Sequence, residues 1–208
     1  PYAANLLLDS LNILKDYEAL EKWVAKMLKS RDLARGELLT TLRRLKRGIA
    51  RKKLEQYQKV GRYRECGEGY AKLANDYPDD PRWPELAYNA AICFEAAKLI
   101  GQAIMIRDAL IRVKPKHKLA HKALYQVGQN YHALAWYSRA ADYYEKFAKQ
   151  FPGETEAPDA LRDAIVFRLG RAEYEKALDN VRFFAKKYGG RRKFKSRAAA
   201  AFFSLGSY

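Results

Sequence analysis

Lysine and arginine are concentrated in three stretches of the chain. The 208 residues include 40 Lys and Arg against 24 Asp and Glu, a formal net charge of +16. Such an excess attracts polyanions: nucleic acid, anionic lipid headgroups, acidic proteins or anionic glycans. Residues 43–53 hold seven cations, 186–197 hold seven, and 112–122 hold five with two histidines. The predicted anion-binding residues are Arg43, Arg44, Lys46, Arg47, Arg51, Lys52, Lys53, Lys186, Lys187, Arg191, Arg192 and Lys193.

These clusters have two interpretations: an anion-binding patch or a solvated basic surface. At 100° per residue the cations of 43–53 spread around most of a helix, which predicts no clean basic stripe. Binding by such clusters would depend on salt and not on base sequence. A nucleic-acid interface is therefore an alternative that the sequence does not favour.

Metal and redox chemistry are not indicated by the histidines and cysteines. His117 and His121 are four residues apart, but zinc needs three or four protein ligands and the neighbouring side chains are lysines. We therefore predict no metal site and no cofactor. Cys66 and Cys93 belong to no Cys-x-x-Cys pair, so we expect buried free thiols and no disulfide framework.

Catalytic motifs are also missing from the sequence. It contains no glycine-rich phosphate loop, no Ser/His/Asp ordering and no metalloprotease helix motif. Its carboxylates are scattered rather than paired in apolar surroundings. We predict a non-catalytic protein. The sequence also shows no apolar run of the roughly 18 residues that a membrane span needs, and no signal peptide. We expect the chain to be a fragment of a longer protein.

A 37-residue repeat sets the positions of these residues. Pro78, Pro115 and Pro152 are 37 residues apart, and Gly189 follows one period later. Helical periodicity runs throughout, without strand alternation. Self-similarity at this period predicts a solenoid of stacked helix pairs.

The clearest helix pair is predicted over residues 121–152. Leu124, Val127, Gly128 and Tyr131 would share one face of its first helix, because their spacing follows the helical repeat. Gly128 and, on the second helix, Ala140 are small, which lets the two helices approach closely. Pro152 is expected to end the pair, since proline lacks an N–H and clashes with the preceding turn.

This pattern resembles the tetratricopeptide repeat, a helix–turn–helix unit with small and aromatic residues at fixed positions and a final proline. The resemblance implies an all-α, right-handed superhelical solenoid of about 4.5–5 repeats. In the fourth copy we align Ala164, Phe167 and Ala177, which requires one extra residue between Gly170 and Tyr174. The expected parts are an irregular repeat and long helix at 1–46, tandem repeats at 47–189 (47–78, 84–115, 121–152 and 157–189), and the first helix of a further repeat at 190–208.

The short segments after each proline, which we call spacers, indicate a particular subgroup of the family. The family period is 34 residues, so about three residues are added per unit, as in Asp79-Asp80-Pro81. Together with a Tyr/Phe-Pro ending, this is similar to bacterial envelope members of the family, including the barrel-assembly lipoprotein and the periplasmic coordinator of the Tol system. The resemblance implies a bacterial multiprotein complex, with a slight preference for the periplasm or envelope.

The first helices of such repeats line a concave groove, to which the alignment assigns a mixture of tyrosine, amide and charged residues. Such a mixture suits a peptide or a partner helix, because aromatic and Arg side chains dominate binding hot spots. The carboxylate clamp of the family needs Lys and Asn one turn apart, and positions such as Tyr88 and Ile92 do not provide it. The predicted groove residues are Arg51, Lys52, Glu55, Tyr88, Asn89, Ile92, Tyr125, Gln126, Gln129, His132, Arg162 and Arg168.

The main hypothesis is therefore a scaffold that binds a peptide or partner segment in this groove, with an acidic partner as one option. Packing of the tyrosines between repeats is the alternative at each position. A polyanion-binding module using the basic clusters is the second hypothesis. Self-assembly through Phe202 and Phe203 at an uncovered C-terminal helix is the third. The sequence indicates no oligomeric state.

Overall fold

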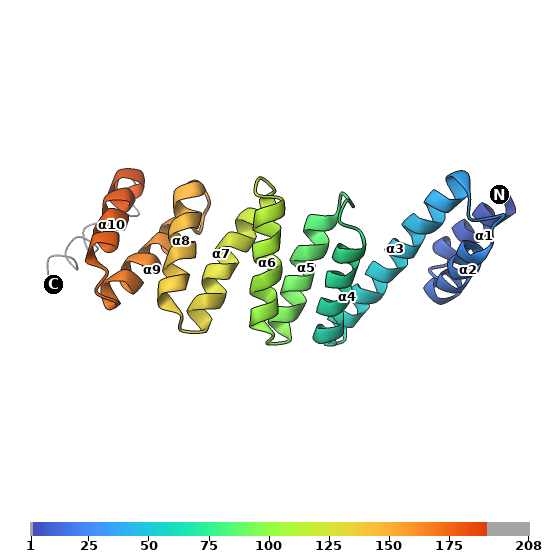
Figure 1. The fold of residues 1–208 in the computed structure, drawn as a ribbon, viewed down its shortest axis with the longest axis horizontal. Coiled ribbons are helices and arrows are strands. Elements are labelled where there is room, and N and C mark those ends of the chain that lie inside the picture. Colours follow the sequence, from blue (N-terminus) through green and yellow to red (C-terminus); the bar gives the residue numbers. More distant parts are fainter. Residues whose placement is uncertain (1, 191–208) are drawn as a thin grey trace.

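The computed structural model describes residues 2–190, and within that range the chain is helical and contains no strand. Its helices lie side by side in chain order, from α1 at one end of the row to α10 at the other (Figure 1). Consecutive helices pack on each other, and α5 also contacts α7. This is the predicted all-α repeat solenoid. The helices are α1 (Tyr2–Ile13), α2 (Tyr17–Lys29), α3 (Gly36–Lys59), α4 (Tyr63–Asp76), α5 (Trp83–Ala96), α6 (Ile100–Val113), α7 (Lys118–Ala133), α8 (Tyr137–Gln150), α9 (Ala157–Gly170) and α10 (Tyr174–Tyr188).

Several predictions fall beyond Gly190, outside the described residues. These are the first helix of the further repeat predicted at 190–208, the pair Phe202 and Phe203 predicted to be uncovered, and the cations Arg191, Arg192 and Lys193. No helix between residues 2 and 190 is both long and apolar enough to cross a bilayer.

The turn inside each helix pair repeats its backbone every 37 residues. A residue with positive φ stands at Gly61, Lys98, Ala135 and Ala172, with φ of 78°, 63°, 57° and 56°. The next N–H donates back to a carbonyl five residues earlier, as from Leu99 to Phe94 (2.8 Å). This left-handed residue with its six-to-one hydrogen bond is a standard helix ending. Three of the four positions carry a side chain, so the turn geometry is maintained without glycine.

The fourth turn corrects one expectation. Glu173 N–H donates to the Arg168 carbonyl (2.8 Å), as Trp136 N–H donates to that of Tyr131 (2.9 Å). The turn between Gly170 and Tyr174 therefore has the same length as the others, and the predicted extra residue is wrong. The error arose from placing Phe167 in the aromatic position of the repeat. By the 37-residue spacing that position holds Arg168.

The prolines end the helix pairs as predicted. Helices α4, α6 and α8 end at Asp76, Val113 and Gln150, two residues before Pro78, Pro115 and Pro152. The residue between helix and proline adopts an extended φ, which proline imposes on its predecessor. The spacers then lead directly into the next first helix.

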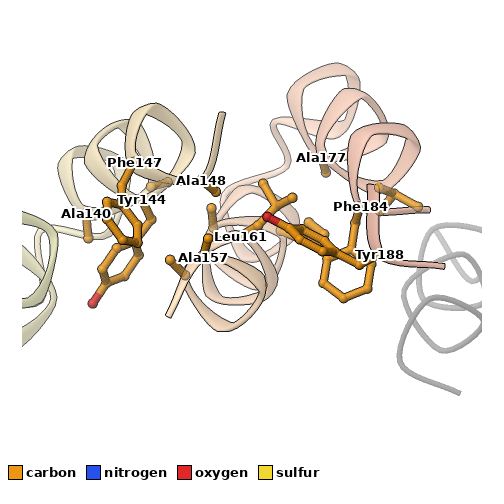
Figure 2. Packing of buried hydrophobic residues seen from close by; sticks show 14 of the residues in the cluster. Ala140, Tyr144, Phe147, Ala148, Ala157, Leu161, Ala177, Phe184 and Tyr188 are labelled. Carbon is orange, nitrogen blue, oxygen red and sulfur yellow. The ribbon is translucent and has the colours of Figure 1, made fainter. Parts of the chain in front are cut away.

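Small residues allow the predicted close packing of α7 and α8. A Cβ added to Gly128 would lie 2.5 Å from Tyr144 Cδ1, so only glycine fits there without displacing the ring. Ala140 is fully buried. Figure 2 shows Ala140 and Tyr144 on one helix, with Leu161 and Phe184 continuing the same core through the following repeat. The core thus runs along the solenoid instead of closing on itself.

The N-terminal part consists of α1, α2 and the long helix α3. Helix α2 begins at Tyr17, and the Asp16 carboxylate caps it by accepting from Ala19 N–H (3.0 Å). Helix α3 has 24 residues, against 14 in α5 and 16 in α7, so this unit is longer in its helix.

The cysteines correct a second expectation. Cys66 on α4 and Cys93 on α5 are both fully buried, as predicted, but they form a disulfide with a Cα–Cα distance of 5.8 Å. Helices α4 and α5 belong to successive repeats and pack directly on each other. The two small positions therefore face each other, although 27 residues separate them in the chain.

Candidate functional site

Two adjoining hollows beside α7 form the first candidate site. Their volumes are about 340 and 390 Å³, and they share Tyr125 and Gln129. We call them together the aromatic pocket. They bring together five predicted groove residues: Tyr88, Tyr125, Gln126, Gln129 and His132. The other lining residues were not predicted: Lys118, His121, Lys122, Ala133, Tyr144, Phe147, Glu154, Glu156 and Asp163.

Tyr125 lies at the junction of the two hollows. Its ring centroid is 5.7 Å from that of Tyr144 and 5.2 Å from that of Phe147, so one face of Tyr125 packs on the core while the residue remains half-buried. Burial, followed by the nearby Asp163 carboxylate, raises the pKa of the Tyr125 phenol. The hydroxyl is therefore neutral at pH 7 and can donate a hydrogen bond. Tyr125 both packs in the core and faces the pocket.

A buried polar network fixes the floor of the aromatic pocket. Gln126 Nε2 donates to the Tyr88 hydroxyl (3.1 Å), and Gln126 Oε1 accepts from Arg107 Nε (3.2 Å). Arg107 is fully buried and also donates from Nη2 to Glu95 Oε2 (2.7 Å) and from Nη1 to Asn130 Oδ1. Both ends of the Gln126 amide are thus hydrogen-bonded within the protein. The exposed Gln129 amide, in contrast, has no hydrogen-bond partner within residues 2–190.

The histidines have structural partners. His117 caps α7 by accepting from Leu119 N–H (3.2 Å), and His121 stacks on Phe151 with ring centroids 3.8 Å apart. His132 is exposed and its ring packs edge-on against Phe167 at 4.7 Å. Across residues 2–190 no three His, Cys, Asp or Glu side chains are grouped as metal ligands.

Both charge signs border the aromatic pocket. Lys118 and Lys122 line it together with Glu154 and Glu156, and the other hollow ends at Asp163. Arg162 Nη2 lies 2.9 Å from Asp163 Oδ1, and its Nη1 lies 3.1 Å from Asp159 Oδ1. The predicted groove residue Arg162 is therefore engaged by two carboxylates beside the pocket.

Arg168 is not available to a partner, which corrects its assignment to the groove. It is 2% exposed. Its guanidinium contacts Glu145 (2.7 Å), Glu173 (2.7 Å) and Asp142. Burial opposes its charge, but the hydrogen bonds to Glu145 and Asp142 outweigh that effect and raise the pKa of Arg168. Arg168 occupies the aromatic position of the repeat and holds α8, α9 and the following turn together.

The remaining predicted groove residues lie elsewhere. Asn89 lies beside the Tyr70 side chain, and Ile92 is half-buried on α5. Lys52 Nζ pairs with Glu55 Oε2 (2.9 Å), and both line a separate hollow of about 540 Å³ between α2 and α3. The twelve predicted residues therefore do not form a single groove.

A second site lies where α3 meets the loop between α4 and α5. This hollow of about 310 Å³ contains four arginines, and we call it the arginine pocket. Arg44, Arg47 and Arg51 share one face of α3, although the seven cations of 43–53 surround the helix as a group. Arg43 and Lys46 are exposed and line no part of it. The lining residues are Arg44, Arg47, Arg51, Leu73, Tyr77, Asp80, Pro81, Arg82 and Leu86.

The fold is similar to those of several solved structures. A tetratricopeptide repeat protein from Parabacteroides merdae is 13% identical with a TM-score of 0.53, over 99% of this chain and 73% of that one. A putative kinesin light chain with nearly identical TPR-like repeats from Podosopora anserina is 11% identical with a TM-score of 0.53, over 92% and 94%. MamA from Desulfovibrio magneticus is 16% identical with a TM-score of 0.50, over 77% and 93%. No family model and no curated protein sequence matches the chain. These similarities establish a tetratricopeptide-like fold and leave the function to be argued from the two pockets.

Proposed function

We propose that this protein is a non-catalytic scaffold that binds a polypeptide segment in the aromatic pocket. The observation that carries the proposal is the junction at Tyr125 and Gln129. Here a half-buried tyrosine with a neutral hydroxyl lies beside an exposed amide, in a hollow that continues in both directions along α7. Solenoids of this kind present extended binding surfaces built from successive repeats.

The chemistry of the pocket suits an extended peptide. Tyrosine offers a large apolar area with few rotatable bonds, and aromatic anchors dominate binding hot spots. The Gln129 amide can both donate to and accept from a peptide backbone. Lysines and glutamates at the rim favour a segment that carries both charges in a fixed order, because complementary charge sets orientation and the rate of encounter.

The disulfide supports an oxidising compartment for this scaffold, because such bonds persist in the periplasm or outside the cell and are rare in the cytosol. It agrees with the envelope-type spacers of the sequence, and we place the scaffold within a bacterial envelope complex. Mass spectrometry after alkylation of the protein isolated from its host, with and without prior reduction, tests this placement. Two alkylated thiols without reduction would contradict it.

Selection of random twelve-residue peptides on the immobilised protein tests the binding function. Selected peptides should lose at least tenfold in affinity when Tyr125→Ala is combined with Gln129→Ala. The matched control, Tyr63→Ala with Gln102→Ala, changes the same residue types at exposed positions on α4 and α6. Equal losses in both double variants, or failure to select any peptide, would contradict the proposal.

A further inference from the structure

The arginine pocket is rich in arginine, and peptide binding in the aromatic pocket does not explain why. It lies against the loop between α4 and α5, and Asp80 of this loop contacts two of the arginines. Asp80 Oδ2 is 3.1 Å from Arg47 Nε, and Asp80 Oδ1 accepts from the backbone N–H of Arg82 (2.9 Å). Arg47 also lies over the Tyr77 ring, 5.0 Å from its centroid. One arginine is therefore fixed by a carboxylate and an aromatic ring.

The other three guanidinium groups have no such partner. Within residues 2–190, Arg44, Arg51 and Arg82 form no ion pair and no side-chain hydrogen bond, although all three line the same hollow. Like charges placed together raise the energy of the free protein and favour an anion between them. Guanidinium forks match the oxygens of phosphate and carboxylate, and several forks around one group favour a dianion.

The rest of the lining is apolar. Leu73, Tyr77, Pro81 and Leu86 form the other walls. A volume of about 310 Å³ leaves room beyond a single anionic group, and it falls at the lower end of the usual range for ligand pockets, about 300–1,000 Å³. The ligand should therefore carry its charge at one end of a small apolar or aromatic body.

We infer that the arginine pocket binds a phosphomonoester group attached to a small apolar body. Arg44, Arg51 and Arg82 contact the phosphate oxygens, Arg47 completes the positive wall, and Tyr77 with Leu86 covers the body. The site uses no residue of the aromatic pocket, so it stands or fails independently of the peptide-binding function.

Calorimetric titration with phenyl phosphate at about 150 mM salt tests the inference, because unspecific attraction to the charge is weakened at that ionic strength. Phenyl phosphate should bind with one-to-one stoichiometry and at least tenfold more tightly than inorganic phosphate, which lacks the ring, or benzoate, which carries one charge. Equal affinity for benzoate, or no binding at millimolar concentration, would overturn the inference.

Matched variants separate the pocket from the general charge of the helix. Arg44→Gln with Arg51→Gln should weaken phenyl phosphate binding at least tenfold. Arg43→Gln with Lys46→Gln removes the same charge from exposed positions of α3 and should change the affinity less than twofold. Thermal melts of both variants establish that they are folded. Equal weakening in the two would show that only the overall charge attracts the ligand.

A further titration tests whether the phosphate group belongs to a phosphorylated protein or to a small molecule. A five-residue peptide centred on phosphotyrosine carries the same phenyl phosphate on a polypeptide. Tighter binding of this peptide than of phenyl phosphate would indicate a phosphorylated protein, and equal binding would indicate a small organic phosphate. A peptide that fails to bind while phenyl phosphate does bind would also indicate the small molecule.

Discussion

The arginine pocket and the aromatic pocket occupy the same place in the repeat, two units apart. Six of their lining residues correspond through a shift of 74 residues, twice the repeat period. The helix positions change from arginine to lysine, histidine and tyrosine, and the loop position Arg82 becomes Glu156. The pairs are Arg44 and Lys118, Arg47 and His121, Arg51 and Tyr125, Leu73 and Phe147, Asp80 and Glu154, and Arg82 and Glu156.

This correspondence shows that the repeat determines where a hollow forms and the side chains determine what it can bind. The turns keep their left-handed residue, and α4, α6 and α8 end at the same position before each proline. The backbone of the two sites is therefore equivalent. Four arginines and one aspartate make the first strongly positive, whereas the second combines two lysines with two glutamates and Asp163.

The buried network beneath the aromatic pocket should give the largest effect. Arg107 stands where the neighbouring repeats have Tyr70 and Tyr144, and Arg107→Ala removes the donor to Glu95 Oε2, Asn130 Oδ1 and Gln126 Oε1. We expect a loss of about 4 kcal/mol in the free energy of unfolding, the middle of the range for a broken buried pair, because Arg107 is fully buried whereas Glu95 is partly exposed. Urea denaturation measures it. A loss below about 1 kcal/mol would show that the network contributes little to stability.

Reduction of the disulfide should give the next largest loss of stability. This loss concerns two of the helices that form the arginine pocket. The bond between Cys66 and Cys93 spans 27 residues and joins the two helices that supply Leu73 and Leu86 to the arginine pocket. Loop-closure entropy predicts a loss of about 3.5 kcal/mol. Hydrogen exchange should then rise in α4 and α5 before α8 and α9. Uniform acceleration along the solenoid would contradict this local role.

Substitution of the equivalent residues Arg51 and Tyr125 by alanine should lower the free energy of unfolding by different amounts. Tyr125→Ala removes ring contacts to Tyr144 and Phe147 and should cost about 1–2 kcal/mol, less than truncation of a fully buried aromatic. Arg51→Ala should cost less than about 0.5 kcal/mol, because Arg51 has no partner among the described residues. Paired thermal melts measure the difference. Equal costs would show that Arg51 is a structural residue as well.

The smallest expected effect is on the pH dependence of stability. It comes from two tyrosines on α8. Burial raises the pKa of Tyr144, and burial with the hydrogen bond to Asp108 raises that of Tyr143. An acid whose pKa is raised in the folded state holds its proton longer there, so stability is retained below the ordinary value of about 10 and falls as the pH rises above it. Tyr144→Phe should make this alkaline decline shallower. A decline of unchanged slope would exclude Tyr144 as a contributor.

The sequence predicted the features that repeat and missed those that depend on contacts between repeats. The prolines, Gly128 and Ala140 have local causes, so their roles could be derived from spacing. Arg168 was misplaced because an ion-paired arginine can fill a position that the pattern reserves for an aromatic. Neither the disulfide nor the pocket residues in the spacers, such as Arg82 and Glu156, has a local signal. Comparison of residues 74 apart would have shown that the two sets of residues are equivalent, although not that they line hollows or that the arginines are unpaired.

One titration tests the central claim that equivalent places in this solenoid are two different binding sites. Phenyl phosphate and a selected peptide are added in turn to one nitrogen-15-labelled sample, and backbone amide shifts are followed by NMR. We expect phenyl phosphate to shift residues around 44–51 and 77–86 and the peptide to shift residues around 118–132 and 154–163, and each ligand should bind equally well when the other is present. Overlapping shifts, or competition between the two ligands, would contradict the central claim.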